Sequence, residues 1–236
     1  MKVRMKFAKT GPLMYVGHLD LLRYFQKVFR RAGVDIAYSQ GFSPHQITSF
    51  AAPLGLGITS QGEYLDAEFN SITTSKDMLE RINAATLTPY IKVTEFVVLR
   101  EEAKKAMASV AGADYYVTVP DKPELKDSLA AHLESFLAQK EIRILKKTKK
   151  SEVEVDIRPH IHCFHLKEDG FYLRLTTGSN NNLKPELVMS SLCSFSGVPY
   201  DAFDFHVHRL DMLLWVEEGE NAGHFAPLSS AGDIVS

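Results

Sequence analysis

The chain has 236 residues, of which 45% are apolar and 24% are charged, as in an ordinary globular protein. This length suits one large domain or two domains of about 100 residues each. No apolar run reaches the roughly 18 residues that a membrane-spanning helix requires. Cys163 and Cys193 are too few for a disulfide framework or a four-cysteine metal centre. The start, MKVRMKFAKTG, lacks the apolar core of a signal peptide, so we expect a cytoplasmic protein.

The charge is unevenly distributed along the chain. The net charge is −2, but the first 50 residues carry +6 and the rest therefore carries −8. Asp20 and Asp35 are the acidic residues of this segment, and the basic ones are Lys2, Arg4, Lys6, Lys9, Arg23, Lys27, Arg30 and Arg31. This asymmetry indicates that the amino-terminal part meets an anionic partner while the remainder keeps the protein soluble.

In the first half of the chain, the hydrophobic pattern predicts alternating strands and helices. Residues 2–8 alternate between apolar and basic side chains, which predicts a half-buried strand with a basic outer face. Apolar residues recur at helical spacing between His18 and Ala32, and Gly33 is a natural helix stop. The other elements expected here are a strand at 36–38, a long connection at 39–62 interrupted by a short strand near 47–51, a strand at 63–69, a helix at 75–85 and a strand at 91–99.

The second half repeats this order with additions. After a polar helical stretch at 101–110, we expect a strand at 115–119, a helix at 123–138, a hairpin of 142–147 and 152–157 across a lysine-rich turn, a second hairpin of 163–166 and 171–176, a helix at 185–195 and a strand at 207–216.

These elements predict an α+β fold made of two ferredoxin-like βαββαβ domains with antiparallel sheets. We place the amino-terminal domain at 1–110, the carboxy-terminal domain with its extra hairpin at 111–216, and a loosely ordered tail at 217–236. The alternative is a single intertwined domain that shares one sheet.

The first helix carries a basic stripe. Arg23, Lys27, Arg30 and Arg31 are spaced so that they share one side of the helix, opposite the apolar stripe. Such a stripe is often only a solvated helix face. However, no carboxylate is interleaved between Arg23 and Arg31, and Arg4 lies on a strand whose outer face is basic, so the stripe also fits a phosphate-binding surface.

Two polar segments flank this helix. His18 and Asp20 form its entry, where free backbone N–H groups favour an anion, and His18 is either an acid–base group or a simple helix-capping residue. After the helix comes a turn with the features of a rigid ligand contact: glycine for close approach, proline for rigidity, an aromatic ring and polar groups. Its candidate residues are Tyr38, Ser39, Gln40, Gly41, Phe42, Ser43 and His45. The chain has neither of the glycine-rich phosphate motifs.

Polar residues also follow the long connection. Glu63, Tyr64, Asp66 and Glu68 lie on an expected strand. The first three are candidates for ligand contact, and the alternative is that Asp66 and Glu68 pair with the basic helix in a salt-bridge network. The group His160, His162, His206 and His208 suggests a metal site, but strand alternation separates neighbouring ligands, and edge-strand histidines without a metal are the simpler interpretation. We assign no metal, no cofactor and no catalytic residue, with His18 and His45 as the catalytic candidates.

Residues 6–69 resemble the opening of bacterial radical SAM-linked proteins, a family built on a domain of unknown function. The pattern is HLD-L-R-F…RRAG…YSQGFSPH…SFA-PL-LG-S-GEY-D, and weaker likeness continues through Glu154–Pro159 and Pro185–Leu187. The family's motif positions are matched here by His18, Asp20, Arg23, Arg30, Arg31, Tyr38, Gln40, Gly41, His45, Glu63, Tyr64 and Asp66.

The resemblance implies a partner. In that family the domain occurs alone or as the carboxy-terminal extension of a cobalamin-type radical SAM protein, often beside genes for ribosomal proteins and a ribonuclease. This sequence lacks the CxxxCxxC motif that holds the iron–sulfur cluster, so it cannot generate the radical itself. We therefore expect an accessory protein that presents RNA or another phosphate-bearing substrate to a radical SAM enzyme. The alternatives are a stand-alone RNA-binding module and an RNA-processing or modifying enzyme that uses His18 and His45.

Overall fold

A computed structural model describes residues 1–147, 152–178, 181–217 and 223–236 of the chain. They form two compact units. Unit 1 contains residues 1–111 and 209–236, and unit 2 contains residues 112–208. The first boundary lies close to the expected one at 110, but the last 28 residues return to unit 1 instead of ending the second domain and forming a separate tail.

Unit 1 contains a ferredoxin-like fold. Its elements are β1 (Lys2–Lys9), a short 3₁₀ helix (Gly11–Tyr15), α1 (His18–Ala32), β2 (Thr48–Phe50), β3 (Thr59–Glu68), α2 (Ser75–Ala84), β4 (Ile91–Leu99) and α3 (Ala106–Ser109). The strand order is β4-β1-β3-β2, and each of these neighbours is antiparallel. This order and the two helices give the expected α+β, ferredoxin-like architecture.

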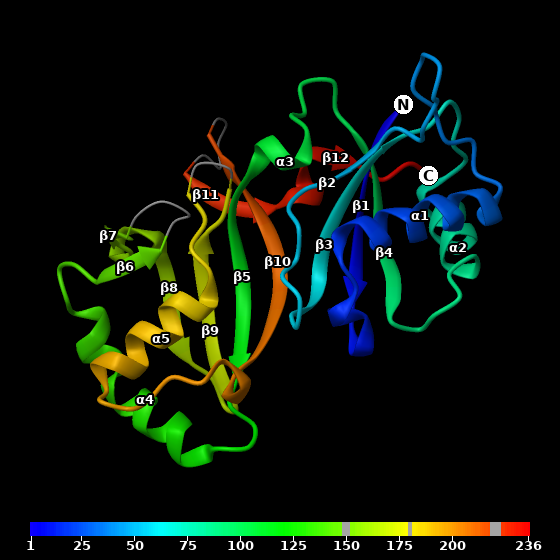
Figure 1. Ribbon diagram of the computed structural model, residues 1–236. Coiled ribbons are helices and arrows are strands. Elements are labelled where there is room, and N and C mark those ends of the chain that lie inside the picture. Colours follow the sequence, from blue (N-terminus) through cyan, green and yellow to red (C-terminus); the bar gives the residue numbers. More distant parts are fainter. Residues whose placement is uncertain (148–151, 179–180, 218–222) are drawn as a thin grey trace. The chain divides into compact units, whose positions relative to one another are not determined.

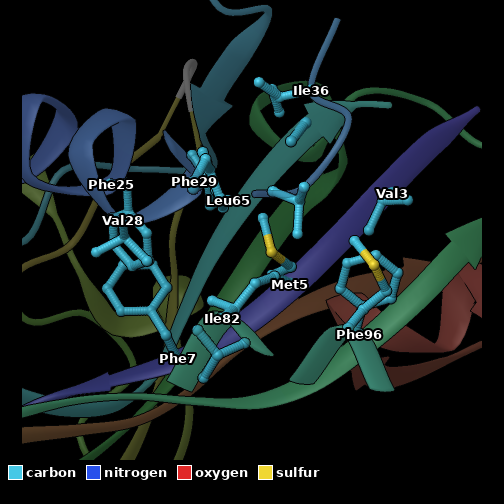
Figure 2. Close-up of a cluster of buried hydrophobic side chains, with 14 of the residues drawn as sticks. Val3, Met5, Phe7, Phe25, Val28, Phe29, Ile36, Leu65, Ile82 and Phe96 are labelled. Atoms are coloured by element: carbon cyan, nitrogen blue, oxygen red, sulfur yellow. The ribbon is translucent and has the colours of Figure 1, made fainter. Parts of the chain in front are cut away.

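The core of unit 1 lies between its sheet and its first two helices. α1 and α2 cover the same face of β1, β3 and β4 (Figure 1). Phe25, Val28 and Phe29 of α1 are fully buried, and Figure 2 shows them together with Met5 and Phe7 of β1. Because the apolar side of α1 is used for this packing, its basic side faces away from the core.

The ends of α1 follow from its sequence. Gly17 precedes the first turn, and no side chain caps the free N–H groups there. At the other end Gly33 adopts φ 60°, the left-handed conformation that glycine tolerates best, and its N–H bonds to the Arg30 carbonyl. The helix therefore spans the residues that the spacing predicts.

Unit 2 repeats the ferredoxin-like order with one inserted hairpin. Its elements are β5 (Val110–Thr118), α4 (Pro123–Leu137), the hairpin β6 (Arg143–Lys147) and β7 (Glu152–Asp156), β8 (Ile161–Leu166), β9 (Gly170–Thr176), α5 (Pro185–Phe195) and the first residues of β10 (His206–Val216). The strand order is β10-β5-β9-β8, and α4 packs beside α5 (Figure 1). The lysine-rich turn expected in the inserted hairpin extends over 148–151, outside the described residues.

Several segments differ from the sequence-based expectation, and β3 and β5 also begin earlier than expected, at Thr59 and Val110. Residues 36–38 form only isolated bridges, Ile36 to Phe69 and Tyr38 to Gln46, whereas the short strand expected near 47–51 is present as β2 and is the second strand of unit 1. The expected helical stretch at 101–110 is reduced to the single turn α3. In the tail, residues 218–222 lie outside the described part, but the rest is ordered as β11 (His224–Pro227), a 3₁₀ turn (Leu228–Ala231) and β12 (Gly232–Asp233).

The ordered tail is held by packing and hydrogen bonds within unit 1. Leu228 is fully buried, β12 pairs with β4, and the Val235 carbonyl accepts from the backbone N–H of Ser75. Its Gly- and Ser-rich composition gives no sign of these contacts. None of the helices in the described ranges combines the length and apolar character that crossing a membrane requires.

Candidate functional site

The exposed side of α1 carries three basic residues, Arg23, Lys27 and Arg30, which we call the α1 basic face. All three are exposed. Arg23 pairs with Asp20 at 3.1 Å, but both side chains are 69% exposed, so water screens this pair strongly. Within the described part of the chain, Lys27 and Arg30 have no carboxylate within 4.0 Å. The face therefore carries a net positive charge that an external anion can neutralise.

Arg31, the fourth basic residue of the predicted stripe, has a different role. Its Nε donates to the Ala85 carbonyl at 3.0 Å, at the carboxy-terminal end of α2. A cation at that end of a helix interacts favourably with the helix dipole. Arg31 therefore ties α1 to α2, and we leave it out of the α1 basic face.

The predicted turn at 38–45 is attached to α1. Gln46, which is buried, donates through Nε2 to the Gln26 carbonyl and to the Tyr38 hydroxyl, both at 3.3 Å. Gln26 lies one turn from Arg23 on one side and from Arg30 on the other. The turn therefore lies beside the basic helix, a contact that could not be predicted from the sequence alone.

The polar groups of the turn are partly used to hold its own shape. The Ser39 hydroxyl lies 2.9 Å from His45 Nδ1 and accepts from the His45 backbone N–H at 3.1 Å. Gly41 has φ 113°, a conformation that other residues rarely adopt. The shape of the turn leaves Phe42 at its tip fully exposed, with Gln40 and Ser43 exposed beside it.

This arrangement combines positive charge with accessible aromatic rings. Tyr38 is 46% exposed and Phe42 projects freely into solvent. Basic side chains neutralise backbone phosphates, and exposed aromatic rings stack on bases without strict sequence preference. The α1 basic face and the 38–45 turn together have the chemistry of a surface for a single-stranded nucleic acid.

The second predicted group is buried and has internal partners. Glu63 and Arg209 form a bidentate ion pair with distances of 2.8 and 2.6 Å, and both side chains are 4% exposed. Arg4 is fully buried and donates to both oxygens of Asp66, at 2.7 and 3.0 Å. Asp66 is therefore in a salt bridge, but its partner is Arg4 of β1 and not a residue of the basic helix. Glu63 pairs with Arg209 of β10.

Tyr64 belongs to the same buried network. Its hydroxyl donates to Asp211 at 2.7 Å, and Lys6 reaches the other oxygen of that carboxylate at 2.7 Å. Burial and the Asp211 carboxylate raise the pKa of the Tyr64 hydroxyl, and burial also raises the pKa of Asp211. These groups hold β10 against the β1–β3 part of the sheet, which is a structural role.

The two catalytic candidates line different pockets. The His18 ring packs edge-on against Phe50 at 5.0 Å and borders a cavity of only about 10 Å³, which it shares with Lys9 and Glu63. Burial lowers the pKa of the Lys9 ammonium, while the Glu63 carboxylate acts in the opposite direction. His45 borders a larger pocket of about 200 Å³. Acid–base chemistry by both histidines on one substrate atom therefore has no support in this geometry.

Two histidines of unit 2 contact the hydroxyl group of Thr176. His160 Nδ1 and His162 Nε2 lie 3.3 and 2.8 Å from Thr176 Oγ1. Across the described ranges, no group of three or more His, Cys, Asp or Glu residues is arranged to hold a metal ion. The metal interpretation of His160, His162, His206 and His208 gains no support from these positions.

Some residues of the site were not singled out in the sequence. Gln46 looks like any polar residue of a loop, yet it joins the turn to α1. The 200 Å³ pocket is lined by residues of four separate segments. Leu99, Ala103 and Lys105 carried no signal in the sequence, and Lys2 and Glu68 were noted only as charged strand residues. The lining residues lie up to 103 positions apart, so no local motif could have pointed to the pocket.

A protein-family model matches most of the chain. The model of the family described as "Uncharacterized protein conserved in bacteria (DUF2344)" matches residues 2–185. No curated protein matches the chain. The matched range contains the α1 basic face, the 38–45 turn and most of unit 2.

Proposed function

The chain belongs to this family of uncharacterised proteins conserved in bacteria, and we propose that it is a cytoplasmic accessory protein. In this proposal it presents RNA, or another phosphate-bearing substrate, to a separate radical SAM enzyme. The α1 basic face is the contact surface for the phosphates in this proposal. The 38–45 turn supplies aromatic rings for unstacked bases.

The observation that carries the proposal is the unneutralised charge of the α1 basic face beside two accessible aromatic rings. Lys27 and Arg30 have no carboxylate partner among the described residues, whereas the buried cations Arg4 and Arg209 each have a bidentate one. Unit 1 therefore pairs these two buried guanidinium groups with carboxylates and leaves the charges of Lys27 and Arg30 open on the surface of α1. A phosphate backbone is the ligand that such a surface fits best.

The link to a radical SAM enzyme is supported by the sequence resemblance of residues 6–69. The two cysteines lie on β8 and α5, and Cys193 is fully buried, so they do not form a motif for an iron–sulfur cluster. In the proposal, radical chemistry takes place on the partner enzyme, and this chain holds the substrate.

Replacing Arg23, Lys27 and Arg30 together with alanine is expected to weaken RNA binding and to flatten its salt dependence. Each phosphate contact with single-stranded RNA contributes about 0.7 to the slope of log K against log salt, so losing three contacts lowers the slope by about 2. Fluorescence anisotropy with a labelled single-stranded RNA, titrated between about 50 and 200 mM salt, measures both quantities.

The matched control removes three exposed lysines of unit 2, Lys140, Lys167 and Lys184, and so changes the net charge equally. We expect the control to retain most of the wild-type slope. If both triple variants lost affinity equally, the attraction would be a property of the whole protein and not of the α1 basic face. No RNA binding by the wild type at low salt would refute the RNA part of the proposal.

Co-purification tests the enzyme partner. With a tagged chain expressed in its native bacterium, we expect a radical SAM protein to be retained, and to be retained more strongly when RNA is present. Mass spectrometry of the eluate, compared with an eluate from the Arg23/Lys27/Arg30 alanine variant, identifies it. RNA binding without such a partner at micromolar concentration would leave a stand-alone RNA-binding module as the function.

A further inference from the structure

Unit 1 contains a pocket of about 200 Å³ that is separate in its lining from the α1 basic face. It is bounded by β2, the end of β3, the start of β1 and the segment between β4 and α3. The lining residues are Lys2, His45, Ile47, Thr48, Ser49, Asp66, Ala67, Glu68, Leu99, Ala103 and Lys105. We call it the β2–β3 pocket.

Part of the lining of the β2–β3 pocket is apolar, and the pocket volume suits a small planar ligand. Ile47, Leu99 and Ala103 contribute aliphatic surface from two of the four segments. A dry apolar cavity of about 150 Å³ accommodates benzene. A pocket somewhat larger than this, open to solvent on one side, fits one planar heterocycle with room for a polar substituent at the mouth.

Two lysines add positive charge to this pocket. Lys2 and Lys105 are both exposed, and neither has a carboxylate within 4.0 Å in the described part of the chain. The neighbouring Asp66 does not neutralise them, because its oxygens already accept from Arg4 and from the backbone N–H of Ala106 at 2.7 Å. The pocket can therefore hold an anionic group such as a phosphate.

Glu68 is the second carboxylate of the pocket. It lies directly across from Lys2 in the β1–β3 register. In the described residues, no side chain donates a hydrogen bond or forms an ion pair with it. A carboxylate in this position accepts hydrogen bonds from amino groups, as acidic side chains do from the amino groups of bases.

We propose that the β2–β3 pocket binds one nucleotide unit whose base carries an exocyclic amino group. The base lies against Ile47, Leu99 and Ala103, its amino group donates to Glu68, and its phosphate lies near Lys2 and Lys105. The unit is either a free nucleoside monophosphate or one unpaired nucleotide of an RNA strand. This site is additional to the phosphate contacts of the α1 basic face and does not depend on them.

The proposal predicts base selectivity. Adenine, cytosine and guanine each carry an amino group, whereas uracil presents carbonyl oxygens on both sides of its single N–H. Next to the Glu68 carboxylate these oxygens are repelled. We expect AMP, CMP and GMP to bind about tenfold more tightly than UMP, the effect of one hydrogen bond to a charged group.

Isothermal titration of the full chain with the four nucleoside monophosphates tests this selectivity. Glu68→Gln keeps the size of the side chain but removes its charge, and is expected to reduce the difference between UMP and the others. Lys2→Ala with Lys105→Ala is expected to weaken all four about tenfold. Binding of none of the four at millimolar concentration, or equal binding of UMP, would overturn the proposal.

The location is tested by filling the pocket. Ala103→Leu adds bulk at the wall and is expected to abolish binding, while Ala103→Ser keeps the volume and should bind as the wild type does. Unchanged thermal melting of both variants shows that the fold is intact. Binding that survives Ala103→Leu in a folded protein would show that the nucleotide lies elsewhere.

A five-nucleotide RNA distinguishes the two sources of the ligand. If it binds at least tenfold more tightly than the free nucleotides and Ala103→Leu abolishes that gain, an RNA strand supplies the nucleotide. Equal or weaker binding identifies a free nucleotide. The Arg23/Lys27/Arg30 alanine variant should bind AMP as the wild type does, so failure of the α1 basic face and failure of this pocket give different results.

Discussion

Glu63→Ala is expected to lower the free energy of unfolding of unit 1 by about 3–5 kcal/mol, the usual cost of removing one partner of a buried ion pair. The Glu63 and Arg209 side chains are 4% exposed and share two hydrogen bonds. Alanine leaves the Arg209 guanidinium buried without this carboxylate, and water cannot solvate it there. The effect thus arises from the remaining charge more than from the lost attraction.

The single tryptophan gives a selective measurement of this effect. Trp215 lies in unit 1, half-exposed and packed edge-on against Phe225 at 4.9 Å. Its fluorescence during urea unfolding therefore follows unit 1 even when the two units unfold in separate transitions.

Asp20→Ala is the control for Glu63→Ala. It breaks the exposed Asp20–Arg23 pair and should change the stability by no more than about 1 kcal/mol. A loss below 1 kcal/mol for Glu63→Ala would contradict the structural role of the buried pair.

Arg4→Met is expected to have a comparable effect, about 3–5 kcal/mol, with a local signature. Arg4 is fully buried, and besides Asp66 it donates to the carbonyls of Leu228, at 2.9 Å, and Lys104, at 3.0 Å. Methionine fills the space of the aliphatic stem but leaves the Asp66 carboxylate and both carbonyls without these donors. The segments around residues 104 and 228 should therefore detach before the rest of unit 1 unfolds.

Hydrogen–deuterium exchange with mass spectrometry can detect this detachment as faster exchange in peptides covering 104–109 and 224–236. Arg100→Ala is the matched control, because Arg100 also contacts the tail, at Asp233 and the Ser230 carbonyl, but is 41% exposed. We expect it to cost no more than about 1 kcal/mol. Equal exchange in the two variants would show that Arg4 does not hold the tail.

The helices and most strands could be predicted because each depends on local periodicity. The apolar residues of α1 recur at helical spacing, and Gly33 marks its end, so the expected range 18–32 agrees with the structure. The second strand of unit 1 was expected at 36–38 because Ile36 and Tyr38 alternate. Pairing there is limited to two bridges, whereas Thr48–Phe50 finds a continuous register on β3.

The site was harder to predict because charged residues look alike in a sequence whether they are buried or exposed. Glu63 and Tyr64 were candidates for ligand contact, but in the structure they bond to Arg209 and Asp211, which lie 146 and 147 positions away in the sequence. The residues that line the β2–β3 pocket are also far apart in the sequence, by up to 103 positions, so no local pattern predicts the pocket. In contrast, the α1 basic face follows from spacing within one helix, and the sequence could indicate it.

The return of the chain to unit 1 at Arg209 sets the order in which the protein can be completed during synthesis. All residues of unit 2 are synthesised before Arg209, Asp211 and Leu228, although these three are needed to satisfy Glu63, Tyr64 and Arg4. The residues of unit 2 are therefore complete at His208, whereas unit 1 cannot complete its buried ion pairs until the last part of the chain has been synthesised. A fragment truncated after residue 111 would contain the entire α1 basic face and still lack the groups that keep its scaffold folded.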